Sequence, residues 1–393
     1  MVKKILVSAV LSATLLFNLS AKAKPDVLPE TKNIMKSINS FDSRLFSQLS
    51  RTDKNVNYSA ISIYNLLYAL LKGSDGETQK QLCEALDSTD SPLLDEELKA
   101  IISNIKNMTN SVWYKKSLML EPVYKNKIKD FNFMLKPTDF TRTENTRNTI
   151  NSFIAKNTKN LIPKFLDQDL DPLTQLVLLN TLYFQQKWEK EFDKDDTVED
   201  DFYTDKSTII PVDLMFQSTK VAYYEDSDFQ AIELPYKDNR YSMIVFLPKK
   251  RIFDFTKINL PEMVEKFCTY DNCKYEKVEI SLPKFDLNSR YDLVPILQSI
   301  GINDIFSPTN ANIPKIFINN KRIFVDTAIH EVRIIVNEKE TKAAAVTMFG
   351  LKAMGALPMD RIIFRADHPF CYVIRDKDLN INLFSGIVRN PLK

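Results

Sequence analysis

The segment that decides the fold is Val325-Asp-Thr-Ala-Ile-His-Glu-Val-Arg-Ile-Ile-Val336, followed directly by Asn337-Glu-Lys-Glu-Thr-Lys-Ala-Ala-Ala-Val-Thr347. The first half is apolar and β-branched with His330 and Val332 on one face, which predicts a long strand. In the second half three alanines and flanking threonines replace this pattern, and no proline occurs up to Leu357. About twenty residues separate this strand from the next, which is long for a connection within a compact domain.

Composition alone leaves three interpretations of the segment after Val336 open. Residues Glu338–Phe349 include good helix formers, above all alanine, so a permanent helix is the first. A surface loop without a role is the second. In the third, the residues are small because they must fit between other strands, so that a loop held outside a sheet joins it later.

The rest of the chain changes character near residue 170. Helical spacing of apolar residues is typical of the first part, as in Ile34–Leu49 and the almost wholly apolar Ser59–Leu71. Strand patterns are typical of the second part, as in Leu176–Phe184 and Leu383–Val388. Helices first and strands afterwards predict an α+β fold with a large, mostly antiparallel sheet. Because no repeat or linker divides the chain, we expect one domain.

The composition excludes several classes of enzyme. The chain has six glycines, where average usage would give about 27. None of the glycine-rich phosphate-loop motifs occurs, nor does GxSxG, which removes the motif-defined nucleotide binders and the α/β-hydrolases. There are two histidines, His330 and His368, too few for a zinc site built mainly on histidine. We therefore expect no cofactor, no metal and no enzyme activity.

The N-terminus has the three parts of a secretory signal peptide. Lys3 and Lys4 precede the apolar run Ile5–Phe17, and Ala21-Lys22-Ala23 offers a small-residue cleavage site. The run is shorter than the roughly 20 residues that span a bilayer. We therefore predict a signal peptide at 1–23, a single domain at 24–393 and a secreted protein. Removing 1–23 leaves a nearly neutral chain, with no electrostatic reason to bind nucleic acid or membrane.

Four cysteines follow the signal peptide: Cys83, Cys268, Cys273 and Cys371. In an oxidising compartment a local disulfide between Cys268 and Cys273 is one alternative, and two thiols are the other. Cys83 and Cys371 lie within apolar patterns typical of buried side chains.

Several motifs, in the right order, resemble the serpin family from about Ile34 to Pro391. The C-terminal signature is His368-Pro-Phe-Cys-Tyr-Val-Ile374 followed by Leu383-Phe-Ser-Gly-Ile-Val-Arg-Asn-Pro391. Three upstream segments are also similar to family motifs: Ser59-Ala-Ile-Ser-Ile63, Asn180-Thr-Leu-Tyr-Phe-Gln-Gln-Lys-Trp188 and Leu282-Pro-Lys-Phe285.

The resemblance implies about nine helices and three β-sheets, with a large central sheet and an exposed reactive-centre loop at about 338–358. It implies that Ser62, Asn180 and His330 form a polar cluster under the strands that must part. It also implies a salt bridge between Lys284 and Glu338 where the loop leaves the sheet. The hinge then comprises Glu338, Glu340, Thr341, Lys342, Ala343, Ala344, Ala345, Val346 and Thr347.

The resemblance further implies a suicide-substrate inhibitor of serine proteases. The protease attacks the loop and forms an acyl-enzyme, and the cleaved loop then inserts as a new strand of the central sheet. The hinge spacing puts the reactive bond at Met354–Gly355, with Lys352–Ala353 as the rival. Met354 suits chymotrypsin-, elastase- or subtilisin-like enzymes, whereas Lys352 suits trypsin-like ones.

Two other functions remain open. A non-inhibitory serpin, acting as a carrier or chaperone, is favoured by Glu340, which stands where the family has glycine. A secreted hydrolase would need a nucleophile and base beside His368. We expect the protein to be a monomer whose partner is the target protease. Residues 90–108 mix lysines with acids, so we expect no strong heparin site.

Overall fold

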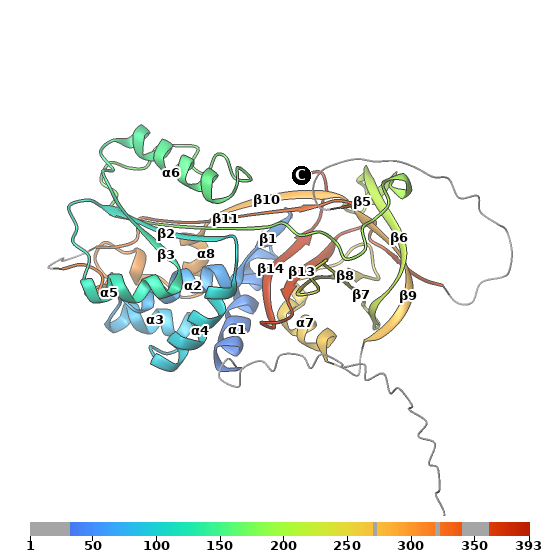
Figure 1. Ribbon diagram of the computed structural model, residues 1–393, viewed down its shortest axis with the longest axis horizontal. Coiled ribbons are helices and arrows are strands. Elements are labelled where there is room, and N and C mark those ends of the chain that lie inside the picture. Colours follow the sequence, from blue (N-terminus) through green and yellow to red (C-terminus); the bar gives the residue numbers. More distant parts are fainter. Residues whose placement is uncertain (1–31, 270–272, 319–322, 340–360) are drawn as a thin grey trace, which may run out of the picture.

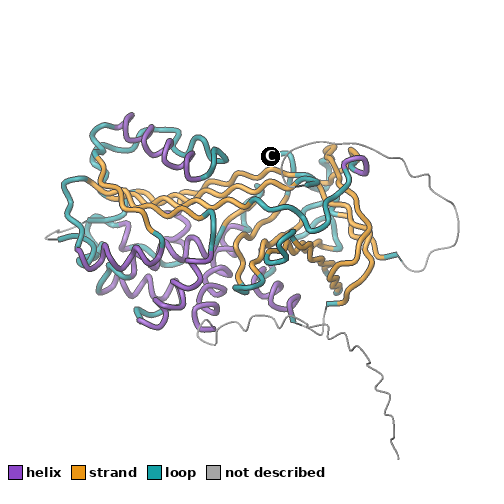
Figure 2. Tube along the Cα trace, viewed as in Figure 1, coloured by secondary structure: helices purple, strands orange, loops and turns teal. Residues whose placement is uncertain are grey.

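The computed structural model describes residues 32–269, 273–318, 323–339 and 361–393 (Figure 1). Two β-sheets form its framework. The long strands of the first sheet run along the molecule, and the second sheet lies toward one end of it. Helix α6 (Thr143–Asn157) covers one face of the first sheet, and most other helices lie on the opposite side. Figure 2 shows the same arrangement, with α6 separated from the remaining helices by the long strands.

The first sheet has five strands in the order β10-β11-β4-β2-β3. Its pairs alternate: β10–β11 and β4–β2 are antiparallel, whereas β11–β4 and β2–β3 are parallel. The strands are β10 (Phe285–Asp292), β11 (Thr327–Val336), β4 (Leu176–Phe184), β2 (Met108–Lys115) and β3 (Phe133–Thr138). We call this sheet the central sheet.

The second sheet has nine strands, of which eight follow the order β1-β14-β13-β8-β7-β6-β9-β12 and β5 pairs with β6. Its pairs are antiparallel except for β12–β9. The strands are β1 (Val56–Tyr58), β14 (Ile381–Val388), β13 (Phe370–Asp376), β8 (Tyr241–Pro248), β7 (Phe229–Pro235), β6 (Ile209–Glu225), β9 (Lys274–Pro283), β12 (Ile362–Arg365) and β5 (Val198–Tyr203).

Within the described residues there are eight α-helices. Besides α6 they are α1 (Lys32–Leu49), α2 (Ala60–Leu71), α3 (Gly76–Leu86), α4 (Pro92–Asn104), α5 (Pro122–Lys127), α7 (Leu260–Cys268) and α8 (Leu293–Ser299). Every residue of α2 is buried, because this helix packs against β4 of one sheet and β14 of the other. Its nearly continuous apolar sequence therefore reflects its place between the two sheets.

The α+β prediction is confirmed, with differences in detail. The described residues form eight α-helices and two sheets rather than about nine and three. The central sheet is mixed, not mostly antiparallel, and that description fits the nine-stranded sheet instead. Alternating apolar residues show which face of a strand is buried, but they do not fix the direction of its neighbour.

Asparagine occupies many of the backbone positions where glycine is the usual residue. Residues with positive φ other than glycine are Asp87, Asn107, Asn132, Lys159, Asn160, Asn239 and Asn380. Asparagine visits this left-handed region more readily than most residues with a side chain. Gly386 has a different reason to be glycine, since a Cβ atom there would lie 2.5 Å from the Val56 carbonyl oxygen.

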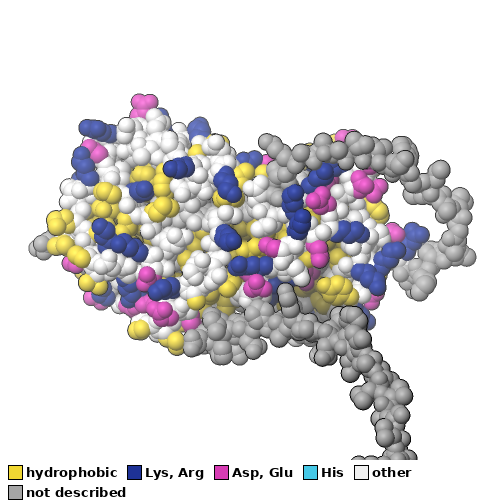
Figure 3. Space-filling view, in the orientation of Figure 1, with side chains coloured by type: hydrophobic (Ala, Val, Ile, Leu, Met, Phe, Trp, Pro, Cys, Tyr) yellow, Lys and Arg dark blue, Asp and Glu magenta, His cyan; other side chains and the backbone are white. Residues whose placement is uncertain are grey.

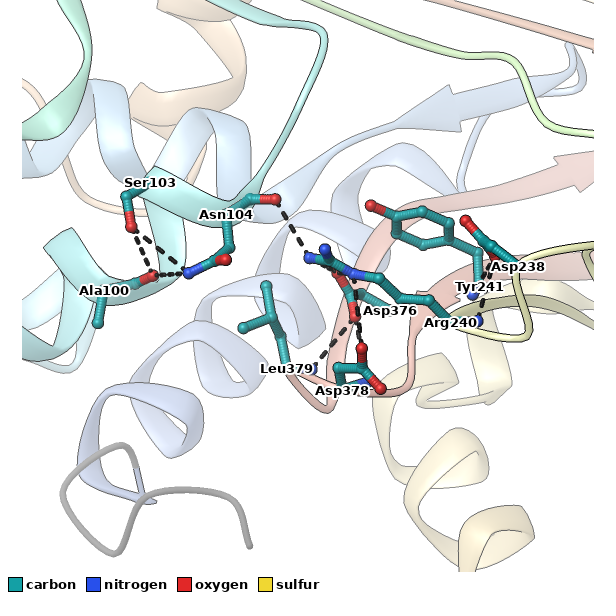
Figure 4. A network of polar contacts seen from close by, with 9 residues as sticks. All are labelled: Ala100, Ser103, Asn104, Asp238, Arg240, Tyr241, Asp376, Asp378 and Leu379. Atoms are coloured by element: carbon teal, nitrogen blue, oxygen red, sulfur yellow. Dashed lines mark hydrogen bonds and ion pairs between the residues drawn. The ribbon is translucent and has the colours of Figure 1, made fainter. Parts of the chain in front are cut away.

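A partly buried ion pair fastens α4 to the nine-stranded sheet (Figure 4). Arg240, in the turn between β7 and β8, donates from Nε and Nη2 to Oδ2 of Asp376 at 2.9 and 2.6 Å. Its Nη2 also donates to the Asn104 carbonyl at the end of α4, at 3.2 Å. The guanidinium thus satisfies both a fully buried carboxylate and an open helix C-terminus.

The exposed surface mixes charges of both signs. On the face drawn in Figure 3, Lys and Arg side chains alternate with Asp and Glu, and apolar side chains lie scattered between them. In the part of the chain that the structure describes, no helix has the length and apolar character needed to cross a membrane.

Candidate functional site

The candidate site is the boundary between β4 and β11, which we call the seam. The two strands run parallel and in register from Val177 opposite Thr327 to Phe184 opposite Ile334. Both therefore end at the same edge of the central sheet. A segment that followed β11 and turned back would run antiparallel to both strands, and between them it would replace one parallel pair by two antiparallel pairs.

A hydrogen-bonded cluster crosses the seam on the face toward α2. Asn180 of β4 lies directly opposite His330 of β11, and His330 Nδ1 is 2.5 Å from Asn180 Oδ1. The same oxygen accepts a hydrogen bond from Ser62 Oγ of α2 at 2.7 Å. Asn180 Nδ2 donates to Asn110 Oδ1 of β2. The side-chain amide of Asn180 thus connects β4 to β11, to β2 and to α2.

The partners of His330 define its tautomer. The backbone N–H of Ser59 points at Nε2 from 3.1 Å and can only donate, so Nε2 accepts and Nδ1 carries the proton. Burial lowers the pKa of His330 to about 3, so the ring is neutral. Tyr291 of β10 stacks on it at 6.3 Å between ring centroids. Tyr291, His330, Asn180 and Asn110 form one row across four strands.

A second cluster holds the chain where it leaves β11. Lys284 Nζ lies 3.3 Å from Glu338 Oε1, and Thr197 Oγ1 donates to the same oxygen at 3.1 Å. The Phe192 backbone N–H donates to the Glu338 carbonyl at 2.9 Å. Trp188 Nε1 donates to the Asn337 carbonyl at 2.8 Å. The backbone of Asn337 and Glu338 is thus hydrogen-bonded to residues that follow β4 in the chain, and the Glu338 side chain is held as well.

The electrostatics of Lys284 and Glu338 agree with an ion pair. Burial acts to raise the pKa of Glu338, but hydrogen bonds from its own backbone N–H, Lys284 and Thr197, with the Lys284 charge, lower it overall. For Lys284, burial acts to lower the pKa, whereas Asp213 and Glu338 raise it overall. The lysine is about one-third exposed and Glu338 nearly buried, so the carboxylate depends on the lysine more than the reverse.

The structure brings together the residues predicted for both clusters. Ser62, Asn180 and His330 meet at the seam, and Lys284 meets Glu338 at its end. Sequence reasoning gave no role to Asn110, Thr197 or Trp188. Trp188 and Thr197 lie in or near a recognised motif, which was the available signal. The other predicted hinge and reactive-bond residues lie outside the described residues: Glu340, Thr341, Lys342, Ala343, Ala344, Ala345, Val346, Thr347, Lys352, Ala353, Met354 and Gly355.

Of the two alternatives for Cys268 and Cys273, a disulfide or two thiols, the structure has two thiols. The two sulfurs are not bonded to each other. Cys273 Sγ donates to the Phe267 carbonyl at 2.9 Å, and Cys268 Sγ accepts from the Arg375 guanidinium. Each thiol is thus held by a different neighbour.

Comparison with known proteins agrees with this geometry. The family described as Serpin (serine protease inhibitor) matches residues 36–391. Iripin-2 of Ixodes ricinus is 32% identical, over 91% of this chain and 94% of its own. A protein of Cyanea capillata named serine protease inhibitor is 31% identical, over 86% of this chain and 93% of its own. The crystal structure of uncleaved ovalbumin superimposes with a TM-score of 0.80 at 23% identity, over 91% and 100% of the two chains.

The chain belongs to the serpin family. The motifs near both ends of the domain, the fold and the family match therefore agree. The family is described by protease inhibition rather than by catalysis.

Proposed function

We propose that the protein is a secreted suicide-substrate inhibitor of serine proteases. The observation that carries this proposal is the parallel pairing of β4 and β11 beside the point where the chain leaves β11. A strand inserted there would exchange one parallel pair for two antiparallel pairs, and parallel pairing is slightly less stable per residue. The name of the Cyanea capillata relative, serine protease inhibitor, supports the same function.

The residues after β11 suit a strand that inserts into the seam. Segment 341–354 would extend over about 46 Å at roughly 3.3 Å per residue, longer than the ten-residue β11. It contains no proline, which would remove a ladder hydrogen bond from an interior strand. Ala343, Ala344 and Ala345 add little volume between neighbouring strands. Insertion would carry the protease, still attached to the cut end of the loop, along the seam before water releases it.

The proposed targets are proteases with apolar primary pockets, of the chymotrypsin, elastase or subtilisin type. This choice rests on Met354 as the residue before the reactive bond, at the spacing implied by the hinge. Lys352 is the rival and would select trypsin-like enzymes. Secretion is proposed from the signal-peptide pattern at 1–23.

A non-inhibitory serpin, a carrier or chaperone that proteases cut as a plain substrate, is the second candidate. Glu340 favours it, because a carboxylate near the start of the inserting segment would be costly to bury. Both candidates share the fold, and neither has catalytic activity of its own. They differ in what remains after a protease cuts the loop.

The test is to mix the purified protein with chymotrypsin and analyse the products by denaturing gel electrophoresis. The inhibitor should give a covalent complex that survives SDS. Thr341→Arg is the matched control, because an unpaired guanidinium entering the sheet slows insertion and converts inhibitor into substrate. Cleaved protein without any complex, for trypsin and elastase as well as chymotrypsin, would select the non-inhibitory candidate.

A further inference from the structure

The opposite face of the central sheet carries a second polar pair at the level of His330 and Asn180. Glu331 of β11 and Thr181 of β4 lie directly opposite each other across the seam. Both are almost fully buried, at 2% and 0% exposure. Among the described residues neither Glu331 Oε2 nor Thr181 Oγ1 has a hydrogen-bond partner. Buried polar atoms normally have one, so this pair is an exception that requires an explanation.

No cation contacts Glu331 within the described structure, and the charges of Arg290 and Arg333 lower its pKa by less than burial raises it. Its Oε1 accepts one hydrogen bond, from Asn288 Nδ2 at 2.9 Å. Arg290, directly opposite on β10, points instead to Asp167 at 3.3 Å. Arg333, two residues along β11, is held by Asp286 at 2.7 Å and also donates to the Leu161 carbonyl.

The remaining titratable neighbours are also directed elsewhere. Lys159, in the segment after α6, lies over the Tyr183 ring at 5.8 Å. His330 faces the other side of the sheet. Arg290, Arg333 and Lys159 therefore contact other partners. The carboxyl group of Glu331 lies at the seam without a counter-ion in contact.

Helix α6 and residues 158–175 cover this pair and bridge the seam. An apolar cluster joins Ile150, Ile154 and Phe165 of the cover to Leu179 of β4 and Ile329 of β11. Figure 1 shows α6 lying along this face. Because the cover contacts both strands, β4 and β11 cannot separate while it keeps all its contacts. Separation that loosens this cover would expose the Glu331 carboxyl group to water.

We propose that Glu331 makes the opening of the seam depend on protons, with the neutral carboxyl group favouring the closed seam and the carboxylate favouring its opening. The protonated group can remain buried at low cost. The carboxylate is stabilised by water, which reaches it when the strands separate. If the function proposed above holds, the same group sets how readily the cleaved loop enters.

The direction of the pH effect follows from proton binding in the two forms. Burial raises the pKa of Glu331 to about 7 in the closed form, whereas a hydrated glutamate titrates near 4.5. The closed form thus binds more protons between these values, and opening becomes easier as pH rises through this window. From pH 6 to pH 8 the opening equilibrium attributable to Glu331 should increase about tenfold. The reason is that the Glu331 carboxyl group of the closed form changes from mostly protonated to mostly ionised over this interval.

Hydrogen exchange of backbone amides tests this proposal without requiring a protease. Exchange is followed by mass spectrometry in peptides covering β4 and β11 at pH 6 and pH 8, with correction for intrinsic exchange rates. Wild type is compared with Glu331→Gln, which stays neutral. The ratio of wild-type to variant opening cancels the titration of His330 and of other groups. It should rise about tenfold from pH 6 to pH 8.

Two controls make the result specific. Peptides from β6 and β9 should show no such rise, and Glu279→Gln, a strand carboxylate of the other sheet, should behave as wild type. Glu331→Met takes the place of the glutamine variant if that variant does not fold. An unchanged ratio at the seam would overturn the proposal even in a working inhibitor. A tenfold rise in a protein that forms no protease complex would support it while removing the inhibitory function.

Discussion

His330 Nδ1 and Asn180 Oδ1 lie 2.5 Å apart across two parallel strands, so this hydrogen bond must break wherever β4 and β11 separate. Ser62 donates to the same oxygen from α2. The bond therefore couples the opening of the sheet to the helix beneath it. Burying such a network is favourable only while every member keeps its partners.

Asn180→Ala should destabilise the protein by about 2–3 kcal/mol, because it leaves the His330 and Ser62 protons without an acceptor in a buried site. Urea denaturation followed by circular dichroism measures the loss. Asn126→Ala, on the exposed surface of α5, is the control and should change stability by less than about 0.5 kcal/mol. Equal effects of both substitutions would argue against a special role for this amide.

His330 should make the closed protein less stable in mild acid. Its pKa is about 3 in the folded state against 6.5 in water. The unfolded chain therefore binds the proton first, and stability is lost as pH falls below about 6.5. The stability advantage of wild type over His330→Gln should shrink by about 2 kcal/mol between pH 7 and pH 5. Thermal unfolding of both proteins at the two pH values measures this, and a constant difference would contradict it.

Breaking the ion pair at the end of the seam should loosen the start of the loop. Lys284→Ala should cost about 1 kcal/mol, between the values typical of exposed and buried pairs. Glu338 stays bonded to Thr197, which limits the loss. Limited proteolysis after β11 should also become faster. Lys237→Ala, an exposed lysine in the turn after β7, serves as the control. Cleavage at the wild-type rate would show that backbone contacts alone hold this segment.

Target preference provides the fourth prediction. With Met354 before the reactive bond, complexes should form faster with chymotrypsin than with trypsin, since burying such a side chain contributes about 1.5–3 kcal/mol. Met354→Arg should reverse the order, because the guanidinium pairs with the acidic pocket of trypsin. Mass spectrometry of the released C-terminal peptide identifies the bond. A peptide beginning at Ala353 would place Lys352 before it and shift the target class.

Sequence reasoning predicted the face of the seam toward α2 better than the face covered by α6. His330 and Asn180 were predicted because the resemblance to serpins implied that they form a polar cluster with Ser62. Glu331 was not, because a charged residue in an alternating strand ordinarily indicates a solvent-exposed face. Only the tertiary position of α6 and of residues 158–175 buries it. The parallel direction of β4 and β11 was likewise hidden, because side-chain alternation is the same for either direction of a neighbouring strand.

The shortage of glycine affects the unfolded chain as much as the folded one. Asn132 and Asn380 hold left-handed turns that glycine would hold with less strain, but each restricts the unfolded backbone more. Such restriction lowers the conformational entropy lost on folding, and this gain opposes the strain of a side chain at positive φ. Neither effect involves a contact across the seam. Both act alike on the closed and strand-inserted forms, so the choice of asparagine at these turns leaves the rearrangement of the central sheet unaffected.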